Sequence, residues 1–291
     1  MSDGSDKVVC YHKECTDGHC AAWLLRLMWP KATFLGFNPG EPKPDDAIIS
    51  GKDIYVVDMA FKRDDLERMN HIAKSLAVMD HHKTNRDALA GLPYCEFDMG
   101  KSGAGLVFRR FKDEIEEAGA RRVGDVDVLK SLTGYVEDYD IWRFKFADSR
   151  EIHAALSSYP FTFEAWDELF FGANNLWFLA DEGRALMRYR AQLIDRLVKD
   201  AGEKVINGIK VRYVNSPVLQ SETCEALYSV KEPVVACCWA MVDRGGKKVY
   251  RYSFRSKQGP DSIDVAEIAK LYGGGGHHNS AGATSERFIF E

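Results

Sequence analysis

The sequence predicts an α/β protein with two lobes, a larger one built on a parallel sheet and a smaller one of mixed α/β structure. Short apolar runs alternate with helical stretches in the first half of the chain, which is typical of a parallel sheet. A long helical stretch then precedes several further strand-like runs. The chain has 291 residues, which is long for one domain, and 45% of them are hydrophobic, which provides ample core.

The first lobe opens with a strand, a polar turn and a helix. Residues 8–11 form a short apolar run, and the helix predicted at 21–29 stops at Pro30. Similar patterns predict strands at 33–37, 54–57 and 76–79 and helices at 63–74, 102–118 and 126–132. Strands that alternate with helices in this way indicate a largely parallel sheet.

The second lobe follows a long helix predicted at 176–201, which ends at Gly202. Leu186, Tyr189, Leu193 and Leu197 form one stripe of that helix. Beyond it the sequence predicts strands at 205–214, 234–241 and 249–254, a helix at 263–271 and a glycine run at 273–276. We therefore expect a first domain at 1–180, a connector helix at 181–203 and a second domain at 204–291.

Composition excludes several classes of protein. No apolar run approaches the roughly 18 to 20 residues that span a bilayer, and the first residues lack the apolar core of a signal peptide. The seven cysteines are odd in number and show no C-x-x-C pair, which favours reduced thiols. We expect a cytoplasmic protein, in a reducing compartment, with no membrane partner.

The net charge of -5 is unevenly distributed, with +3 from Lys204 onward and -8 before it. An acidic larger lobe argues against binding a long nucleic-acid duplex, which needs many Lys and Arg contacts to phosphates. Clustered carboxylates suit divalent cations instead, and the mildly basic smaller lobe suits an anionic substrate.

Acidic and histidine residues follow the predicted strands. In parallel sheets, ligands gather at the carboxyl ends of the strands, so these side chains are expected at one edge. A further acidic segment follows the helix that ends near Leu132. The set consists of His12 and Asp17 after the first strand, Asp58 after the third, Asp80-His81-His82 after the fourth, and Asp138 with Asp140 after the helix.

This set predicts a site for Mn²⁺ or Mg²⁺, with one or two ions. Carboxylate oxygens suit hard cations, and imidazoles favour Mn²⁺. Asp58 is the natural bridge between two ions. Two such ions about 3.5 to 4 Å apart polarise a phosphoryl group and activate water, so the chemistry expected is phosphoester hydrolysis.

Asp80-His81-His82 resembles the signature of the DHH phosphoesterase superfamily, which includes RecJ-type exonucleases, nano-RNases and family II pyrophosphatases. The run Gly273-Gly274-Gly275-Gly276-His277 is similar to the GGGGH signature of the associated DHHA1 domain. The resemblance covers nearly the whole chain. It implies a parallel-sheet DHH catalytic domain and a DHHA1 substrate-binding domain, facing each other across a cleft.

The resemblance also implies roles for single residues. Asp58 would bridge the metals, Asp17, His81 and Asp138 would hold one ion, and His12 the other. Asp80, His81 and His82 would form the catalytic motif, with His82 touching the scissile phosphate. Asp138 is chosen by the spacing Gly134-x-x-x-Asp138, and Asp140 is its rival.

The first motif departs from the family pattern. Cys15 stands three residues before Gly18, where RecJ-type sequences have an aspartate, and the gap from His12 to Asp17 is one residue longer. Glu14 or His19 are candidate substitutes, because a thiolate is a soft ligand poorly matched to Mn²⁺ or Mg²⁺. A single-metal enzyme is therefore a second expectation.

In the second lobe we expect Gly274, Gly275, Gly276 and His277 to bind a phosphate, because glycines let backbone N–H groups approach it closely. Arg255 at the end of a strand would clamp a terminal phosphate or carboxylate. Trp142 lies near the fourth motif, where its ring could stack on a base, although most of the 34 aromatic residues are core.

Together these observations predict a metal-dependent phosphodiesterase or exonuclease acting on short single-stranded oligonucleotides or small nucleotide phosphoesters. Two alternatives stay open. One is a phosphatase for a small phosphorylated nucleotide, such as 3'-phosphoadenosine 5'-phosphate, or for a cyclic dinucleotide. The other is a nucleotide-binding module without catalysis. The sequence leaves monomer and homodimer open.

Overall fold

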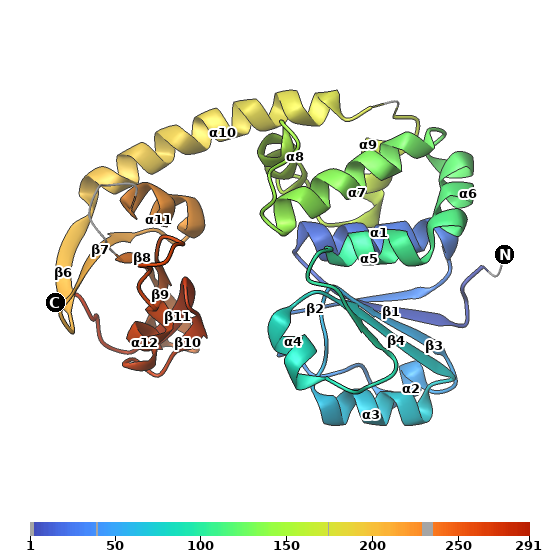
Figure 1. Ribbon diagram of the computed structural model, residues 1–291, viewed down its shortest axis with the longest axis horizontal. Coiled ribbons are helices and arrows are strands. Elements are labelled where there is room, and N and C mark those ends of the chain that lie inside the picture. The colour runs from blue at the N-terminus through green and yellow to red at the C-terminus, as the bar shows by residue number, and fades with distance from the viewer. Residues whose placement is uncertain (1–2, 39, 174, 229–234) are drawn as a thin grey trace. The chain divides into compact units, whose positions relative to one another are not determined.

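The computed structural model describes residues 3–38, 40–173, 175–228 and 235–291. They form two compact units, Met1–Leu186 and Met187–Glu291, each with its own sheet and helices. The division falls inside helix α10 (Trp177–Leu197), within the connector predicted at 181–203 (Figure 1). The predicted α/β class is confirmed.

Unit 1 contains a five-stranded sheet in which every described pair of strands is parallel. Its order is β2 (Thr33–Phe37), β1 (Lys7–His12), β3 (Asp53–Val57), β4 (Ser75–Asp80) and β5 (Cys95–Phe97). The chain passes from β1 to β2 on one side and then returns to place β3 on the other. This reversal makes the carboxyl ends of β1 and β3 a natural ligand crevice.

Helices cover both faces of this sheet (Figure 1). One face carries α1 (Thr16–Met28) and α5 (Gly103–Arg110), with α6 (Lys112–Arg122), α7 (Val126–Asp140), α8 (Ser149–Leu156) and α9 (Phe163–Phe170) beyond them. The other face carries α2 (Asp46–Ile49) and α3 (Arg63–Ile72), and α4 (Lys83–Ala88) follows β4. The helix predicted at 102–118 is divided at Phe111, which ends α5 and begins α6.

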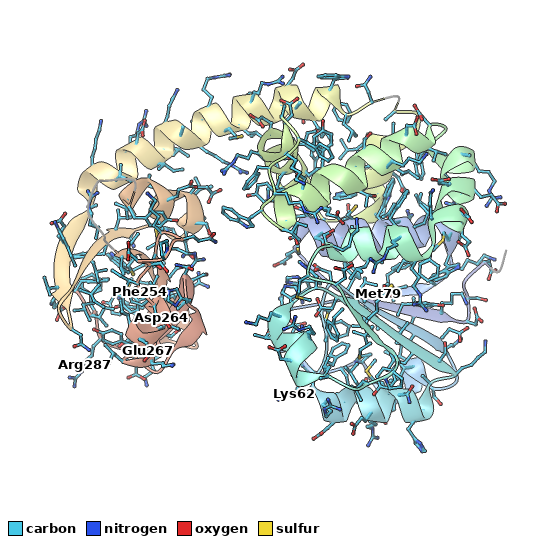
Figure 2. The ribbon with its side chains drawn as sticks, in the orientation of Figure 1. Lys62, Met79, Phe254, Asp264, Glu267 and Arg287 are labelled. Carbon is cyan, nitrogen blue, oxygen red and sulfur yellow. The ribbon has the colours of Figure 1, made fainter. Side chains whose placement is uncertain are left out.

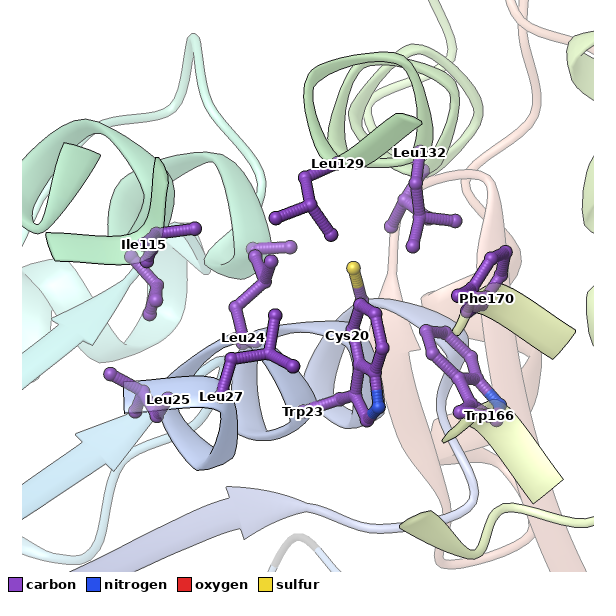
Figure 3. Close-up of a cluster of buried hydrophobic side chains, with 14 of the residues drawn as sticks. Cys20, Trp23, Leu24, Leu25, Leu27, Ile115, Leu129, Leu132, Trp166 and Phe170 are labelled. Carbon is purple, nitrogen blue, oxygen red and sulfur yellow. The ribbon is translucent and has the colours of Figure 1, made fainter. Parts of the chain in front are cut away.

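Alternate residues of each strand pack into different cores. Val9, Val57 and Met79 join α1 in one cluster, whereas Val8 and Ile54 belong to the cluster on the opposite face. Helix α1 lies between the sheet and the outer helices, so it is buried on nearly all sides. Its apolar side chains meet those of α6, α7 and α9 in Figure 3, which labels Cys20, Trp23, Leu24, Leu25, Leu27, Ile115, Leu129, Leu132, Trp166 and Phe170.

Unit 2 is built on a mixed six-stranded sheet. Its order is β10 (Gly275–His277), β11 (Ser280–Ser285), β9 (Lys247–Arg255), β8 (Val235–Arg244), β7 (Ile209–Asn215) and β6 (Gly202–Ile206). Within this sheet, only β7 and β8 pair in parallel among the described strands. A short 3-10 helix, η1 (Val198–Asp200), precedes the sheet, and α11 (Gln220–Tyr228) and α12 (Val265–Lys270) pack on it. Figure 2 shows Phe254 among the side chains of this unit, where it is fully buried.

Two predictions for unit 2 change in detail. The single strand predicted at 205–214 is a hairpin, turned at Asn207 and Gly208, which both have positive φ. Helix α11 was not predicted. Position 234, where the predicted strand 234–241 begins, lies outside the described residues.

Helix α10 is buried at Leu179, Ala180 and Gly183. The stripe predicted along it is not a buried seam, since Tyr189 is 61% exposed. Among the described helices, none combines the length and the apolar character needed to cross a membrane. The seven cysteines are all free thiols.

Asp53, at the start of β3, anchors the edge of the sheet opposite the predicted site. Its carboxylate accepts hydrogen bonds from Ser75 Oγ at 2.7 Å, Lys74 Nζ at 3.0 Å and Lys7 Nζ at 3.3 Å. The bond from Ser75 and the two lysines lower its pKa to about 2, against the opposing effect of burial.

We predict that Asp53→Asn lowers the free energy of unfolding by about 1 to 2 kcal/mol at pH 7. Because the pKa of folded Asp53 is depressed, its contribution is complete above the ordinary value of 3.8 and is lost as pH falls towards about 2. Urea unfolding of both proteins at pH 7 and at successively lower pH measures this. A difference between them that does not shrink on acidification would contradict the assignment.

Candidate metal centre

Asp58 is the centre of the predicted site. It directly follows β3, is 1% exposed and has a φ of 55°, a strained value for a non-glycine residue. Its backbone N–H donates to the carbonyl of Met79 at 2.9 Å, which holds the turn against β4. The carboxylate is thereby fixed at the carboxyl edge of the sheet, beside the point where the strand order reverses.

Residues from three other segments surround the Asp58 carboxylate. His81 Nε2 lies 3.1 Å from Oδ1, and His12 Nδ1 lies 3.4 Å from Oδ2. The Cys15 thiol is 3.5 Å from Oδ2. Potential ligand atoms lie within 4.8 Å of one another in three overlapping groups: Asp58, Asp80, His81 and His82; His12, Cys15 and Asp58; and Asp17, His81 and Asp140.

Asp17 is held in the site by the start of α5. Its carboxylate accepts hydrogen bonds from the backbone N–H groups of Gly103 at 2.6 Å and Ala104 at 2.9 Å, and Oδ2 lies 3.8 Å from His81 Nε2. A Cβ at position 103 would stand only 2.5 Å from Cβ of Asp58. Glycine is therefore required where α5 approaches the cluster. Gly103 is not among the predicted site residues, although the small residues at 103–105 are visible in the sequence.

Asp80 orients His82. Asp80 Oδ1 lies 2.6 Å from His82 Nδ1 and accepts the backbone N–H of His81 at 2.8 Å, while Asn85 donates to Oδ2 at 2.6 Å. The bond to Asp80 raises the pKa of His82 to about 9, so this imidazole is cationic at neutral pH. Its side chain is 45% exposed. A charged, accessible donor at this place suits a phosphate oxygen.

The cluster contains more buried negative charge than its own hydrogen bonds compensate. Burial raises the pKa of Asp17, and the charges of Asp58 and Asp140 raise it further. Burial and then Asp58 raise the pKa of Asp140 to about 6. Burial would also raise the pKa of Asp58, but its bonds to His12 and His81 more than offset this and lower it.

These features fit a divalent cation. Asp140 Oδ2 is buried and has no hydrogen-bond partner among the described residues, which leaves an oxygen free for a ligand. Mutual repulsion among Asp17, Asp58 and Asp140 would be relieved by a positive ion between them. The carboxylate oxygens suit both Mn²⁺ and Mg²⁺, and the imidazoles favour Mn²⁺.

The structure places Asp138, the predicted ligand, outside the groups of potential ligand atoms. The Asp138 carboxylate accepts hydrogen bonds from the N–H groups of Lys145 at 2.9 Å and Phe146 at 3.1 Å and from the Ser149 hydroxyl. Asp140, the rival, instead places Oδ2 3.3 Å from His81 Nε2. Both residues lie on α7, where positions two apart face nearly opposite directions, so only one of them can face the cluster.

Cys15 occupies the N-cap of α1 and takes part in the cluster as a thiol. Burial raises its pKa well above the ordinary value, and the charges of Asp58 and Asp17 raise it further. A protonated thiol donates to Asp58 and is a poor metal ligand. Of the suggested substitutes, Glu14 is exposed, and His19 is buried against Phe163 and Trp166. Neither is brought into the cluster.

A cavity of about 340 Å³ adjoins the centre. His12, Asp58 and His82 line one side, and Phe61 and Lys62 line another. Figure 2 shows Lys62 at the surface, where α3 begins. This cavity is not predictable from the sequence, because the residues that line it come from segments far apart in the chain.

The other predicted site residues lie in unit 2. Arg255 ends β9, where its guanidinium donates to Ser253 Oγ at 3.0 Å and to the Phe254 carbonyl at 2.9 Å. The side chain of His277 lies outside the described residues.

The glycine run shows a packing reason for two of its members and a backbone reason for a third. Gly273 has a φ of 71° in the turn after α12. A Cβ at Gly274 would come within 2.1 Å of the Gly282 carbonyl, and one at Gly276 within 2.6 Å of Ala281. Gly275 has open space where a Cβ would stand. Close pairing with β11 therefore explains glycine at 274 and 276 without a ligand.

Comparisons with known proteins agree with this picture. No protein-family model matches the chain. An uncharacterised protein, R106, of Acanthamoeba polyphaga mimivirus is 26% identical over 300 aligned positions, covering 94% of this chain and 66% of that protein. Oligoribonuclease NrnB of Bacillus subtilis is 25% identical over 256 positions, covering 82% and 60%. The chain thus spans less than two thirds of the length of these curated relatives.

Among solved structures, RecJ in complex with Mn²⁺ from Thermus thermophilus has a TM-score of 0.53 and 14% identity. The match covers 96% of this chain and 50% of RecJ. It shows the same fold across both units. Together with the relatives, it confirms the resemblance to the DHH phosphoesterase superfamily that the sequence motifs indicated.

We predict that Asp140→Asn weakens Mn²⁺ binding at least tenfold, because it removes a negative charge and a free oxygen from the cluster. Asp138→Asn should instead lower the melting temperature and change Mn²⁺ affinity less. Calorimetric Mn²⁺ titration and thermal unfolding of both variants separate the two roles. A larger loss of affinity in Asp138→Asn would restore Asp138 as the ligand.

Proposed function

We propose that this chain is a divalent-metal-dependent phosphoesterase that hydrolyses short single-stranded oligonucleotides or small nucleotide phosphoesters. The observation that carries the proposal is the buried Asp58 cluster with the cationic His82 beside it. Such an arrangement brings a cation site and an anion-binding donor to one place, which is what a phosphoester requires.

His12, Asp17, Asp58, His81 and Asp140 would hold one or two ions, with Asp58 shared between them. Mn²⁺ or Mg²⁺, when bound, supplies Lewis-acid polarisation of the phosphoryl group and lowers the pKa of water. The chain's own groups do the rest. His82 donates a charged hydrogen bond to a phosphate oxygen, and Asp80 keeps the imidazole oriented and protonated.

The surroundings of the cluster support catalysis over mere binding. Asp17 and Asp58 are each 1% exposed, and electrostatic interactions are stronger in such a water-poor site than at a surface. The strained backbone of Asp58 and the tight approach of Gly103 fix the geometry in advance. The protonated Cys15 leaves this arrangement intact, which argues against the non-catalytic alternative.

Unit 2 would contribute substrate binding through Arg255, the glycine run Gly274, Gly275 and Gly276, and His277. The N–H of Gly274 already donates to the Ala269 carbonyl at 2.9 Å, so the phosphate would depend on the rest of the run. The open space at Gly275 supports this role, because no described side chain covers that position. The name of the relative NrnB, an oligoribonuclease, favours oligonucleotides over the alternative of a single small phosphorylated nucleotide or cyclic dinucleotide.

We predict Mn²⁺-dependent cleavage that is strongest on the shortest chains of an oligonucleotide series from two to about 24 nucleotides. Asp58→Asn should abolish turnover, because it removes the shared ligand, while circular dichroism shows an intact fold. The assay uses 5'-labelled RNA and DNA with Mn²⁺, Mg²⁺ or EDTA. Undiminished activity in Asp58→Asn would refute the metal assignment, and cleavage of cyclic dinucleotides alone would favour the alternative substrate.

For Arg255→Ala we predict a rise in KM that exceeds the fall in kcat, as expected when an interaction binds substrate and transition state equally. Steady-state kinetics on a dinucleotide with a 5'-phosphate measures both constants. Arg251→Ala, an exposed arginine of the same strand, is the matched control. An unchanged KM in Arg255→Ala would exclude the clamp.

A further inference from the structure

The loop that follows Asp140 carries an exposed tryptophan. Trp142 is 60% exposed, and its φ of 57° is a strained backbone conformation for a bulky residue. Its backbone N–H donates to the carbonyl of Tyr139 at 3.0 Å. Trp142 stands two residues after Asp140, whose carboxylate belongs to the candidate metal centre.

Asp138 holds this loop in place. Its carbonyl accepts the N–H groups of Arg143 at 2.9 Å and Phe144 at 3.3 Å, in addition to the bonds that its carboxylate makes further along the loop. The guanidinium of Arg143 also pairs with Glu137 at 3.2 Å. A loop with this many bonds is rigid, so the position of Trp142 is fixed before any ligand arrives.

The indole ring of Trp142 packs against the ring of Phe144, which in turn packs against Tyr139. The Phe144 ring lies 5.4 Å from the indole in an edge-to-face arrangement, and the Tyr139 ring lies 5.8 Å from that of Phe144. The Arg150 guanidinium lies 4.1 Å from the centre of the Phe144 ring. These contacts leave the larger part of the indole open to solvent. Exposure of so large an apolar ring to water is unfavourable.

We propose that Trp142 is a stacking platform for a nucleobase that flanks the scissile phosphate. The inference rests on the proposed function, because it assumes a nucleotide phosphoester at the metal centre. Exposure, backbone strain and rigid support coincide at this one residue, which stands two positions after Asp140 in the chain. A base with a free face, as in single-stranded oligonucleotides, gains stacking energy there without any sequence preference.

The test compares two dimers joined by the same phosphodiester, an ordinary dinucleotide and one whose sugars carry no bases. Trp142→Ala should raise KM for the dinucleotide by about 5- to 100-fold, and Trp142→Phe should restore most of the affinity. KM for the base-free dimer should be the same in all three proteins. Trp177→Ala is the matched control, because Trp177 is 68% exposed but lines a different cavity, with Tyr135 and Leu176.

Calorimetric binding of a non-hydrolysable dinucleotide, with Mn²⁺ present, is measured in parallel. Binding that depends on Trp142, without turnover of any dimer by the wild type, would refute the proposed function and keep the platform. Normal turnover with KM and Kd unchanged in Trp142→Ala would refute the platform and keep the proposed function. An equal loss for the base-free dimer would assign Trp142 a structural role and overturn the proposal.

Discussion

The buried carboxylates around Asp58 are the constraint on which the rest of unit 1 depends. Three acids within reach of one imidazole repel one another, and they can be kept there only by hydrogen bonds and geometry that the fold supplies. The backbone N–H groups at the start of α5 stabilise Asp17, and two histidines stabilise Asp58. The remaining negative charge is what makes the site suitable for a cation.

The sheet and helix α1 bring these groups together. Reversal of the strand order at β1 places the ends of β1 and β3 side by side, and β4 adds the two adjacent histidines. Helix α1 is apolar on nearly all sides, so it can lie between the sheet and the outer helices and position α7 above the site. Asp138 and Asp140, both on α7, point in nearly opposite directions. The Asp140 carboxylate lies in the cluster, and the Asp138 carboxylate accepts hydrogen bonds from the loop that follows α7.

Unit 2 illustrates how strand packing constrains a glycine-rich motif. Gly274 and Gly276 pack so closely on β11 that no side chain fits, while Gly275 between them remains open. Glycine at 274 and 276 is therefore explained by strand packing alone, and the N–H of Gly274 is already bonded to the Ala269 carbonyl. The Arg255 guanidinium, on β9, donates to groups of its own strand.

The sequence by itself determined the α/β class, four of the five strands of the first sheet and the residues around Asp58, because apolar periodicity and motif order are local signals. It did not predict β5, the short fifth strand. It left Asp138 and Asp140 undecided, since spacing does not reveal which helix face meets the cluster. It also missed Gly103, the protonated state of Cys15, the cavity beside His82 and helix α11. Only the tertiary structure decided these, because each depends on burial or contact between segments far apart in the chain.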